Sequence, residues 1–159
     1  MAKTPSVGEQ APDFELQGTN GPFKLSDHRG ERVVLLFYPG DETMVCTKQF
    51  CSYRDRAEDF ASLNATVVGI SAQSVSSHEG FTAKHNLNVP LLADVDKTVA
   101  KAYSAVMPGV GTTSRAVIVI DEHGVVRRRH DHRLGLDYQT VDELSEALEQ
   151  LPAQPGAAA

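Results

Sequence analysis

The sequence contains few cysteines, no tryptophan and no long hydrophobic run. Only two of its 159 residues are cysteine, which excludes the disulfide-stapled scaffolds of small secreted domains. No apolar segment approaches the ~20 residues needed to span a bilayer, and the opening MAKTPSVGEQ lacks the apolar stretch of a signal peptide. We therefore expect a cytoplasmic protein, in which a structural disulfide is not expected as the resting state.

Positive charge is scarce as well. Lys and Arg total 15 against 21 Asp and Glu, giving a formal net charge of −6, which argues against a general nucleic-acid binder. The one basic cluster, residues 127–133, is interrupted by an acid and follows a strand-like run. We interpret it as a solvated strand end that resists edge pairing, with an anion or partner contact as the alternative.

Strand-like and helix-like stretches alternate along the chain. Nearly continuous β-branched and aromatic runs are typical of strands buried on both faces, at residues 32–38, 65–71 and 115–121. Apolar spacings of three and four, or capping boxes, predict helices at residues 43–63, 76–85 and 97–106 and after Thr140. A hairpin is expected at residues 122–124. This order predicts an α/β fold with a mixed central sheet flanked by helices, in a single domain of residues 1–151 with a flexible tail at 152–159.

Both cysteines, Cys46 and Cys51, lie in the stretch YPGDETMVCTKQFC at residues 38–51. Cys46 falls near the first turn of the helix that follows a buried strand, where free N–H groups and the helix dipole favour a thiolate. Thr43 stands three residues earlier, where its hydroxyl can cap the helix or contact a ligand, and Pro39 fixes the preceding loop. Cys46 is therefore a candidate nucleophile.

Other interpretations of the cysteines stay open at this point. Cys46 could be a small buried hydrophobic residue, which is a frequent role of a free cysteine. A zinc site is a further alternative, with His130 and His132 completing it from a distant strand end, although a second cysteine pair is missing. The Cys-x-x-Cys motif of thioredoxin-like reductases is absent.

The spacing Pro39-x-x-x-Thr43-x-x-Cys46 resembles the active-site motif of the peroxiredoxins. Four further segments resemble landmarks of that family in the same order, namely GEQAPDFEL, LSDHRGERVVLLFYPG, NVPLLADVDKTVAKAYSAV and SRAVIVIDEHGVV. The four residues between Cys46 and Cys51 are similar to the Q-type subfamily, also called bacterioferritin comigratory proteins. The resemblance covers most of residues 8–151 and implies a thioredoxin-like fold with an N-terminal β extension.

The resemblance also implies a role for each residue of the motif. Cys46 would be the peroxidatic cysteine and Cys51 the resolving cysteine. Thr43 and Arg115 would hold the peroxide and the thiolate, while Pro39 would shield the site.

Gln49 and two departures from the family pattern bear on the shape of this site. Gln49 is expected to hydrogen-bond Arg115, with an exposed helical glutamine as the alternative. Met44-Val45 stands where many relatives have Pro-Gly, and Asp41-Glu42 stands where an aromatic residue is common. We expect these departures to alter the mouth of the pocket, and with it the substrate preference, more than the chemistry.

Members of the family reduce hydroperoxides with electrons from thioredoxin or a similar dithiol. The resemblance therefore implies a thiol-dependent peroxidase that needs no metal or organic cofactor. It would act on hydrogen peroxide and organic hydroperoxides, without nucleic-acid or membrane partners, as a monomer or a weak dimer. Two alternatives remain: a redox-sensing interaction protein that uses Cys46 and Cys51 as a switch, and a one-cysteine peroxidase in which Cys51 is incidental.

Helix geometry limits how the two cysteines can react with each other. On one regular helix, five residues at 1.5 Å and 100° each place the two Cα atoms about 8.5 Å apart and about 140° around the axis. A disulfide needs Cα atoms within about 7 Å. Disulfide formation is therefore predicted to unwind the turn between Cys46 and Cys51.

Overall fold

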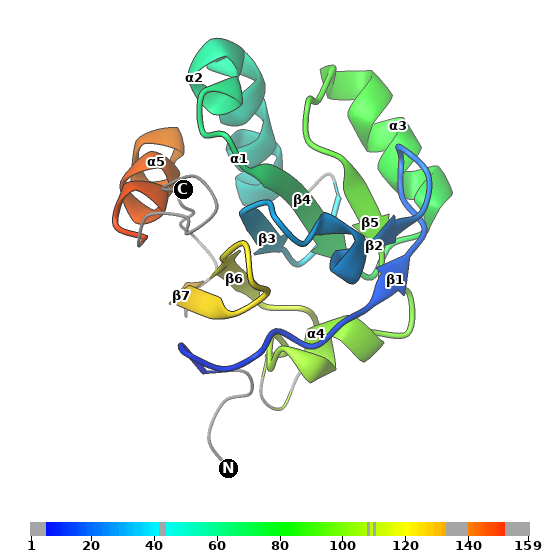
Figure 1. Ribbon diagram of the computed structural model, residues 1–159. Helices are drawn as coiled ribbons and strands as arrows, with labels where there is room; N and C mark the ends of the chain where they lie inside the picture. Colours follow the sequence, from blue (N-terminus) through cyan, green and yellow to red (C-terminus); the bar gives the residue numbers. More distant parts are fainter. Residues whose placement is uncertain (1–5, 42–43, 108, 110, 133–139, 152–159) are drawn as a thin grey trace.

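The computed structural model describes residues 6–41, 44–107, 109, 111–132 and 140–151. Its strands are β1 (Glu15–Leu16), β2 (Phe23–Lys24), β3 (Val33–Phe37), β4 (Thr66–Ser71), β5 (Leu91–Ala93), β6 (Arg115–Ile120) and β7 (Val126–His132). Its helices are α1 (Met44–Asp55), α2 (Ala57–Ala61), α3 (Val75–His85), α4 (Thr98–Ala102) and α5 (Val141–Glu149), with a 3-10 turn η1 (Leu25–His28). Figure 1 shows the helices arranged around a central sheet.

The central sheet has the strand order β5-β4-β3-β6-β7. β3 pairs with β4 in parallel, and β4 with β5 in parallel. β6 runs antiparallel to β3 and forms the expected hairpin with β7. The small antiparallel pair β1-β2 precedes this sheet. The predicted mixed sheet with an N-terminal β extension is therefore confirmed.

Strand β3 lies at the centre of the sheet and is buried on both faces. Its side chains alternate between two core clusters, as the period of two in a strand requires. Val33, Leu35 and Phe37 enter one cluster, which α4 and the N-terminal segment cover. Val34 and Leu36 enter the other, which α1, α3 and α5 cover. The sheet thus forms the middle layer between two sets of helices.

Helix α1 is held in place mainly by packing. It has 12 residues, and helices of that length are marginal in water on their own. Phe50 and Tyr53 are completely buried in the second core cluster. Burial of a side chain such as Phe50 contributes about 1.5–3 kcal/mol. The helix that carries both cysteines therefore depends on its contacts with the sheet.

The first two helices differ in extent from the sequence prediction. The helix predicted over residues 43–63 is interrupted at Arg56, whose backbone (φ −112°, ψ 43°) leaves the helical region between α1 and α2. Helix α3 begins at Val75 rather than at Ser76, because the side chain of Ser74 caps it by accepting a hydrogen bond from the N–H of Ser77. The residues that resembled a capping box therefore lie inside the helix.

Other boundaries also separate prediction from structure. Helix α4 ends before Ser104, whose positive φ of 53° is incompatible with a continuing helix. Strand β5 has only three residues, too few for a periodic pattern to reveal. The capping box at Thr140 is confirmed, since its side chain and that of Glu143 each bond the other's backbone. The tail predicted at residues 152–159 lies outside the described residues.

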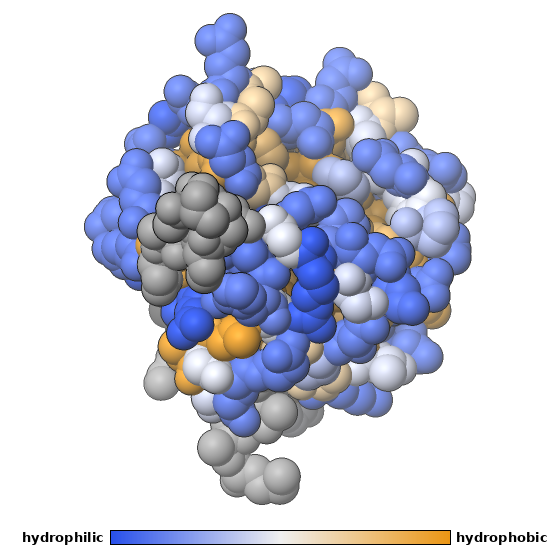
Figure 2. Space-filling view, viewed as in Figure 1, coloured by the Kyte–Doolittle hydropathy of each residue, from blue (hydrophilic) through white to orange (hydrophobic). Residues whose placement is uncertain are grey.

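The face seen in Figure 2 is covered mostly by hydrophilic residues, with apolar residues visible in smaller areas between them. Among the described residues, the large hydrophobic side chains that are exposed are Val7 and Val95. No helix in the described part of the chain is both long enough and apolar enough to cross a bilayer.

Candidate active site

The sheet topology brings Cys46 and Arg115 together, although 69 positions separate them in the sequence. Phe37, the last residue of β3, pairs with Ala116 of the antiparallel strand β6. The start of β6 therefore lies at the same edge of the sheet as the end of β3. The loop from β3 leads into α1, and Cys46 lies in the first turn of that helix.

Cys46 and Arg115 meet in the interior of the protein. The side chain of Cys46 is fully buried, and Arg115 is 1% exposed. Nη2 of Arg115 donates to Sγ of Cys46 at 3.0 Å. A buried guanidinium is unusual unless it is paired, so its contact with a sulfur is a strong indication of a functional site. Arg115 is therefore more than a charge at a strand end.

Gln49 fixes the second arm of the guanidinium. Its Oε1 accepts a hydrogen bond from Nη1 of Arg115, which confirms the predicted pair. Gln49 is 1% exposed, which excludes the exposed helical glutamine. Its Nε2 donates to the hydroxyl of Tyr53 at 3.1 Å. The two bonds together determine the amide's orientation, with the oxygen toward the arginine.

Tyr53, which contacts Gln49, falls within the helix predicted over residues 43–63, but no part in the site was predicted for it. Its position four residues after Gln49 puts the two side chains on one face of α1. That spacing is the signal that could have identified the pair. Among the described residues, Nε of Arg115 has no hydrogen-bond partner.

Tyr38 packs against Phe50, a residue of the helix that carries both cysteines. Tyr38 follows β3, and its ring contacts Phe50 edge-on at 4.8 Å between centroids. The Tyr38 hydroxyl donates to Oδ1 of Asp41 at 2.7 Å. Burial, together with the Asp41 carboxylate, raises the pKa of Tyr38 well above its ordinary value. The phenol is therefore protonated at neutral pH and acts as a donor.

Cys51 lies further along the same helix, in a half-buried position, and both cysteines are free. The intact helix α1 includes both of them. The geometry of a regular helix then separates their Cα atoms by about 8.5 Å, beyond the reach of a disulfide. The unwinding prediction assumed that both cysteines lie on one helix, and in this structure they do.

The structure describes some of the remaining motif residues but not all of them. Pro39 is half-buried and directly follows Tyr38 at the end of β3. Glu42 and Thr43 lie outside the described residues, and so do the predicted contacts of the Thr43 hydroxyl. Val45 is half-buried in the first turn of α1. In the described part of the chain, no group of three or more His, Cys, Asp or Glu residues is placed to hold a metal ion.

These features define a cysteine-based site in a thioredoxin-like α/β fold, and comparison with known proteins identifies the family. Residues 7–129 match the model of the AhpC/TSA family. The chain is 45% identical over 101 residues to peroxiredoxin Bcp of Bacillus subtilis, an alignment covering 63% of this chain and 64% of that protein. It is 38% identical over 146 residues to chloroplastic peroxiredoxin Q of Sedum lineare, covering 91% and 78%. The chain belongs to the AhpC/TSA family, the family of the peroxiredoxins.

A solved structure supports the same conclusion for the fold. The crystal structure of peroxidoxin BcpB from Mycobacterium tuberculosis matches this one with a TM-score of 0.81 and 31% identity, covering 96% of this chain and 100% of that chain. The predicted thioredoxin-like fold and the resemblance to the peroxiredoxins are thus confirmed. The chain spans 60–64% of the length of the first curated relatives that it matches.

Proposed function

We propose that the protein is a thiol peroxidase that reduces hydrogen peroxide and organic hydroperoxides at Cys46. Cys51 would resolve the oxidised Cys46, and an external dithiol such as thioredoxin would return the pair to its reduced form. The observation that carries this proposal is the buried contact of 3.0 Å between Nη2 of Arg115 and Sγ of Cys46. It favours a reactive thiol over a cysteine that serves only as a small hydrophobic residue.

The first step transfers oxygen to sulfur. The thiolate of Cys46 attacks one peroxide oxygen, the O–O bond breaks, and hydroxide or alkoxide leaves with the bonding electron pair. Sulfur is oxidised to a sulfenic acid and the peroxide is reduced. The step requires a donor that stabilises the leaving oxygen as its negative charge develops.

Ionisation of the thiol explains only a small part of the rate. An ordinary protein thiol is about 3% ionised at neutral pH, so complete ionisation raises the reactive population by at most about thirtyfold. Higher acidity also weakens the intrinsic nucleophilicity of a thiolate. Most of the acceleration must therefore come from groups that orient the peroxide and meet the developing charge.

Arg115 is suited to that task. Its Nη1 is held by Gln49 and its Nη2 touches Cys46 Sγ, so the planar fork is fixed before the peroxide arrives. Nε, which has no partner among the described residues, can donate to a peroxide oxygen. The backbone N–H groups near Cys46 and the hydroxyl of Thr43 are the further donors we propose, with Pro39 shielding the site from water.

The second step forms a disulfide and requires α1 to open. The sulfenic acid of Cys46 condenses with the Cys51 thiol, which releases water and links the two sulfurs. The external dithiol then reduces the disulfide by thiol exchange. Both cysteines lie on one helix of one chain, so the cycle works in a monomer. A reducing cytoplasm would suit it, because thiols there are kept reduced.

A coupled assay tests the proposal. Wild type, Cys46→Ser and Cys51→Ser would each be mixed with thioredoxin, thioredoxin reductase, NADPH and hydrogen peroxide. We expect sustained NADPH consumption with wild type, none above background with Cys46→Ser, and little with Cys51→Ser. A single turnover in wild type would identify a redox sensor, and full activity of Cys51→Ser would identify a one-cysteine peroxidase.

A further inference from the structure

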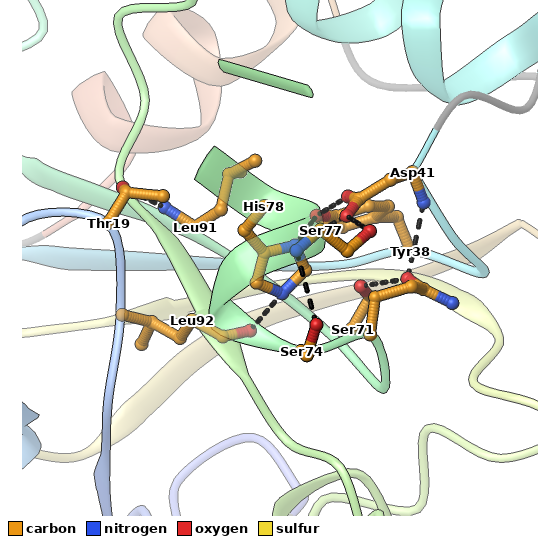
Figure 3. Close-up of polar contacts among 10 residues, drawn as sticks. Thr19, Tyr38, Asp41, Ser71, Ser74, Ser77, His78, Leu91 and Leu92 are labelled. Atoms are coloured by element: carbon orange, nitrogen blue, oxygen red, sulfur yellow. Dashed lines mark hydrogen bonds and ion pairs between the residues drawn. The ribbon is translucent and has the colours of Figure 1, made fainter. Parts of the chain in front are cut away.

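A second cluster of buried polar groups lies behind the cysteine helix. His78 of α3 and Asp41 of the loop between β3 and α1 are 0% and 3% exposed in their side chains. Nδ1 of His78 lies 2.7 Å from Oδ2 of Asp41, and Nε2 lies 2.9 Å from the carbonyl oxygen of Leu92 in β5. Figure 3 shows the imidazole ring between these two acceptors.

Hydrogen bonds fix the orientation of both side chains in this pair. A carbonyl oxygen only accepts, so Nε2 of His78 must donate to Leu92. Burial opposes ionisation of Asp41, but hydrogen bonds from His78, Tyr38 and Ser77 outweigh it and lower the pKa of that carboxyl. Nδ1 of His78 and Oδ2 of Asp41 lie within hydrogen-bond distance of each other, so the two side chains form a buried hydrogen-bonded pair.

Asp41 joins its loop to three segments, the ends of β3 and β4 and helix α3. Besides His78, it accepts from the hydroxyl of Tyr38 at the end of β3 and from that of Ser77 on α3, each at 2.7 Å. The backbone N–H of Asp41 donates to Oε1 of Gln73, beyond β4, at 3.2 Å. Figure 3 shows Tyr38, Ser77 and His78 gathered around Asp41. The loop between β3 and α1 is thereby fastened to α3.

The same residues hold the walls of a slot that receives Phe50. The ring of Phe50 contacts Tyr38 at 4.8 Å and Phe81 at 6.2 Å between centroids. Its tip lies against Gly69, where the Cβ atom of any larger residue would lie only 3.0 Å from the ring. One wall of the slot is formed by Tyr38, directly after β3. The other is formed by Phe81 of α3, which lies one turn after His78. The Asp41–His78 pair therefore cross-links the two walls.

Phe50 connects this slot to the cysteines. It lies immediately before Cys51 and is completely buried, so the turn between Cys46 and Cys51 cannot unwind unless Phe50 leaves its place. We propose that His78 is a positioning residue which, through Asp41, latches the Phe50 slot and sets how readily α1 opens for disulfide formation. The inference rests on the proposed function, because it concerns the fate of the oxidised Cys46.

The sulfenic acid of Cys46 can react in two ways, and the latch affects which of them occurs. In one branch, the Cys46 sulfenic acid condenses with the Cys51 thiol to give a disulfide and water. In the other, the sulfenic acid takes an oxygen atom from a second hydroperoxide, which leaves as water or an alcohol, and becomes a sulfinic acid. Only the first branch requires α1 to open. A firm latch therefore raises the share of sulfinic acid, and a loose latch lowers it.

The experiment compares three loosened variants with matched controls. Asp41→Asn and His78→Asn break the buried pair, and Ser77→Ala removes one donor to Asp41 from an exposed position. Ser76→Ala, at the exposed neighbouring position of α3, controls for the last variant. His123→Asn, in the exposed turn after β6, controls for the histidine change.

Two quantities would be measured on each folded protein. Hydrogen exchange at residues 47–53 in the reduced state reports the opening of α1. Intact mass after a fixed pulse of hydrogen peroxide gives the ratio of sulfinic acid to disulfide. If opening is a rapid pre-equilibrium, exchange rises and the ratio falls by the same factor. We expect about tenfold for Asp41→Asn and His78→Asn, roughly threefold for Ser77→Ala, and no change in the controls.

The outcomes separate this inference from the proposed function. Unchanged exchange and an unchanged ratio in Ser77→Ala and in any folded pair-breaking variant would overturn the latch, even if the melting temperature fell. A wild type that forms no disulfide between Cys46 and Cys51 would overturn the proposed resolving step. In that case hydrogen exchange at residues 47–53 still tests the latch, because it is measured on the reduced protein before any oxidation.

Discussion

Replacement of Arg115 by lysine tests whether the reaction needs only a positive charge beside Cys46 or also the fixed geometry of the guanidinium group. Arg115 supplies two fixed donors, Nη2 to Sγ of Cys46 and Nη1 to Oε1 of Gln49. A lysine ammonium keeps the positive charge but is a single point, so it cannot contact Cys46 and Gln49 and also replace Nε as the proposed donor to the peroxide. Loss of one transition-state donor typically slows a reaction by about 10²–10³-fold. We therefore expect Arg115→Lys to react with hydrogen peroxide at least about a hundred times more slowly.

The same substitution has a separate effect on stability. Without Nη1, the buried Oε1 of Gln49 loses its donor, and an unsatisfied buried acceptor costs about 1–3 kcal/mol. Stopped-flow measurement of the second-order rate on the reduced, folded protein keeps the two effects apart. Arg127→Lys is the matched control, since Arg127 is a partly exposed arginine on β7 that pairs with Asp121 and should change the rate less than twofold. A rate for Arg115→Lys within threefold of wild type would refute the role of the fork.

Three further predictions follow from the described contacts. Cys51→Ser should consume one equivalent of peroxide to form the Cys46 sulfenic acid, and a second equivalent as that species is converted to sulfinic acid, as mass spectrometry would show; oxygen appearing first on Cys51 of the wild type would reverse the assignment. Thr140→Ala should lower the free energy of unfolding by about 1 kcal/mol in urea titrations, because the capping box of α5 is lost. Asp41 has a lowered pKa in the folded state, so its contribution to stability is present above its unfolded value of 3.8 and is lost as pH falls through the folded value; urea midpoints of wild type and Asp41→Asn should converge below that pH, and a constant difference would contradict the shift.

Local pattern predicted most of the fold. The buried run of β3 and the capping box of α5 are signals that lie within a few adjacent residues, and both appear in the structure. Boundaries were less predictable because they depend on backbone angles and on competing caps. Ser74 and Ser76 are equally suitable residue types for the start of α3, and only the observed hydrogen bond distinguishes them.

The site was predictable only as far as its motif extended. The position of Cys46 indicated a candidate nucleophile, and the resemblance of the strand that begins at Arg115 to a landmark of the family implied the arginine. Asp41 and His78 were interpreted separately, as part of a departure from the family pattern and of a helix start. Their contact joins a loop to a helix 37 positions away, and a single sequence carries no local signal for such a pair. One clue was present, since His78 stands three residues before Phe81, on the buried face of α3.

The composition of α1 accounts for how the helix can serve two conflicting purposes. Its sequence, MVCTKQFCSYRD, is rich in residue types with weak helix propensity, such as Val, Thr, Cys and Ser. Local propensity therefore contributes little to its stability, and the packing of Phe50 and the contacts of Cys46 and Gln49 contribute most of it. Each 1.4 kcal/mol of such packing changes the open fraction about tenfold. In the proposed cycle, a helix stabilised in this way keeps Cys46 against Arg115 for peroxide reduction, and the release of Phe50 allows the turn to unwind so that Cys51 can approach Cys46.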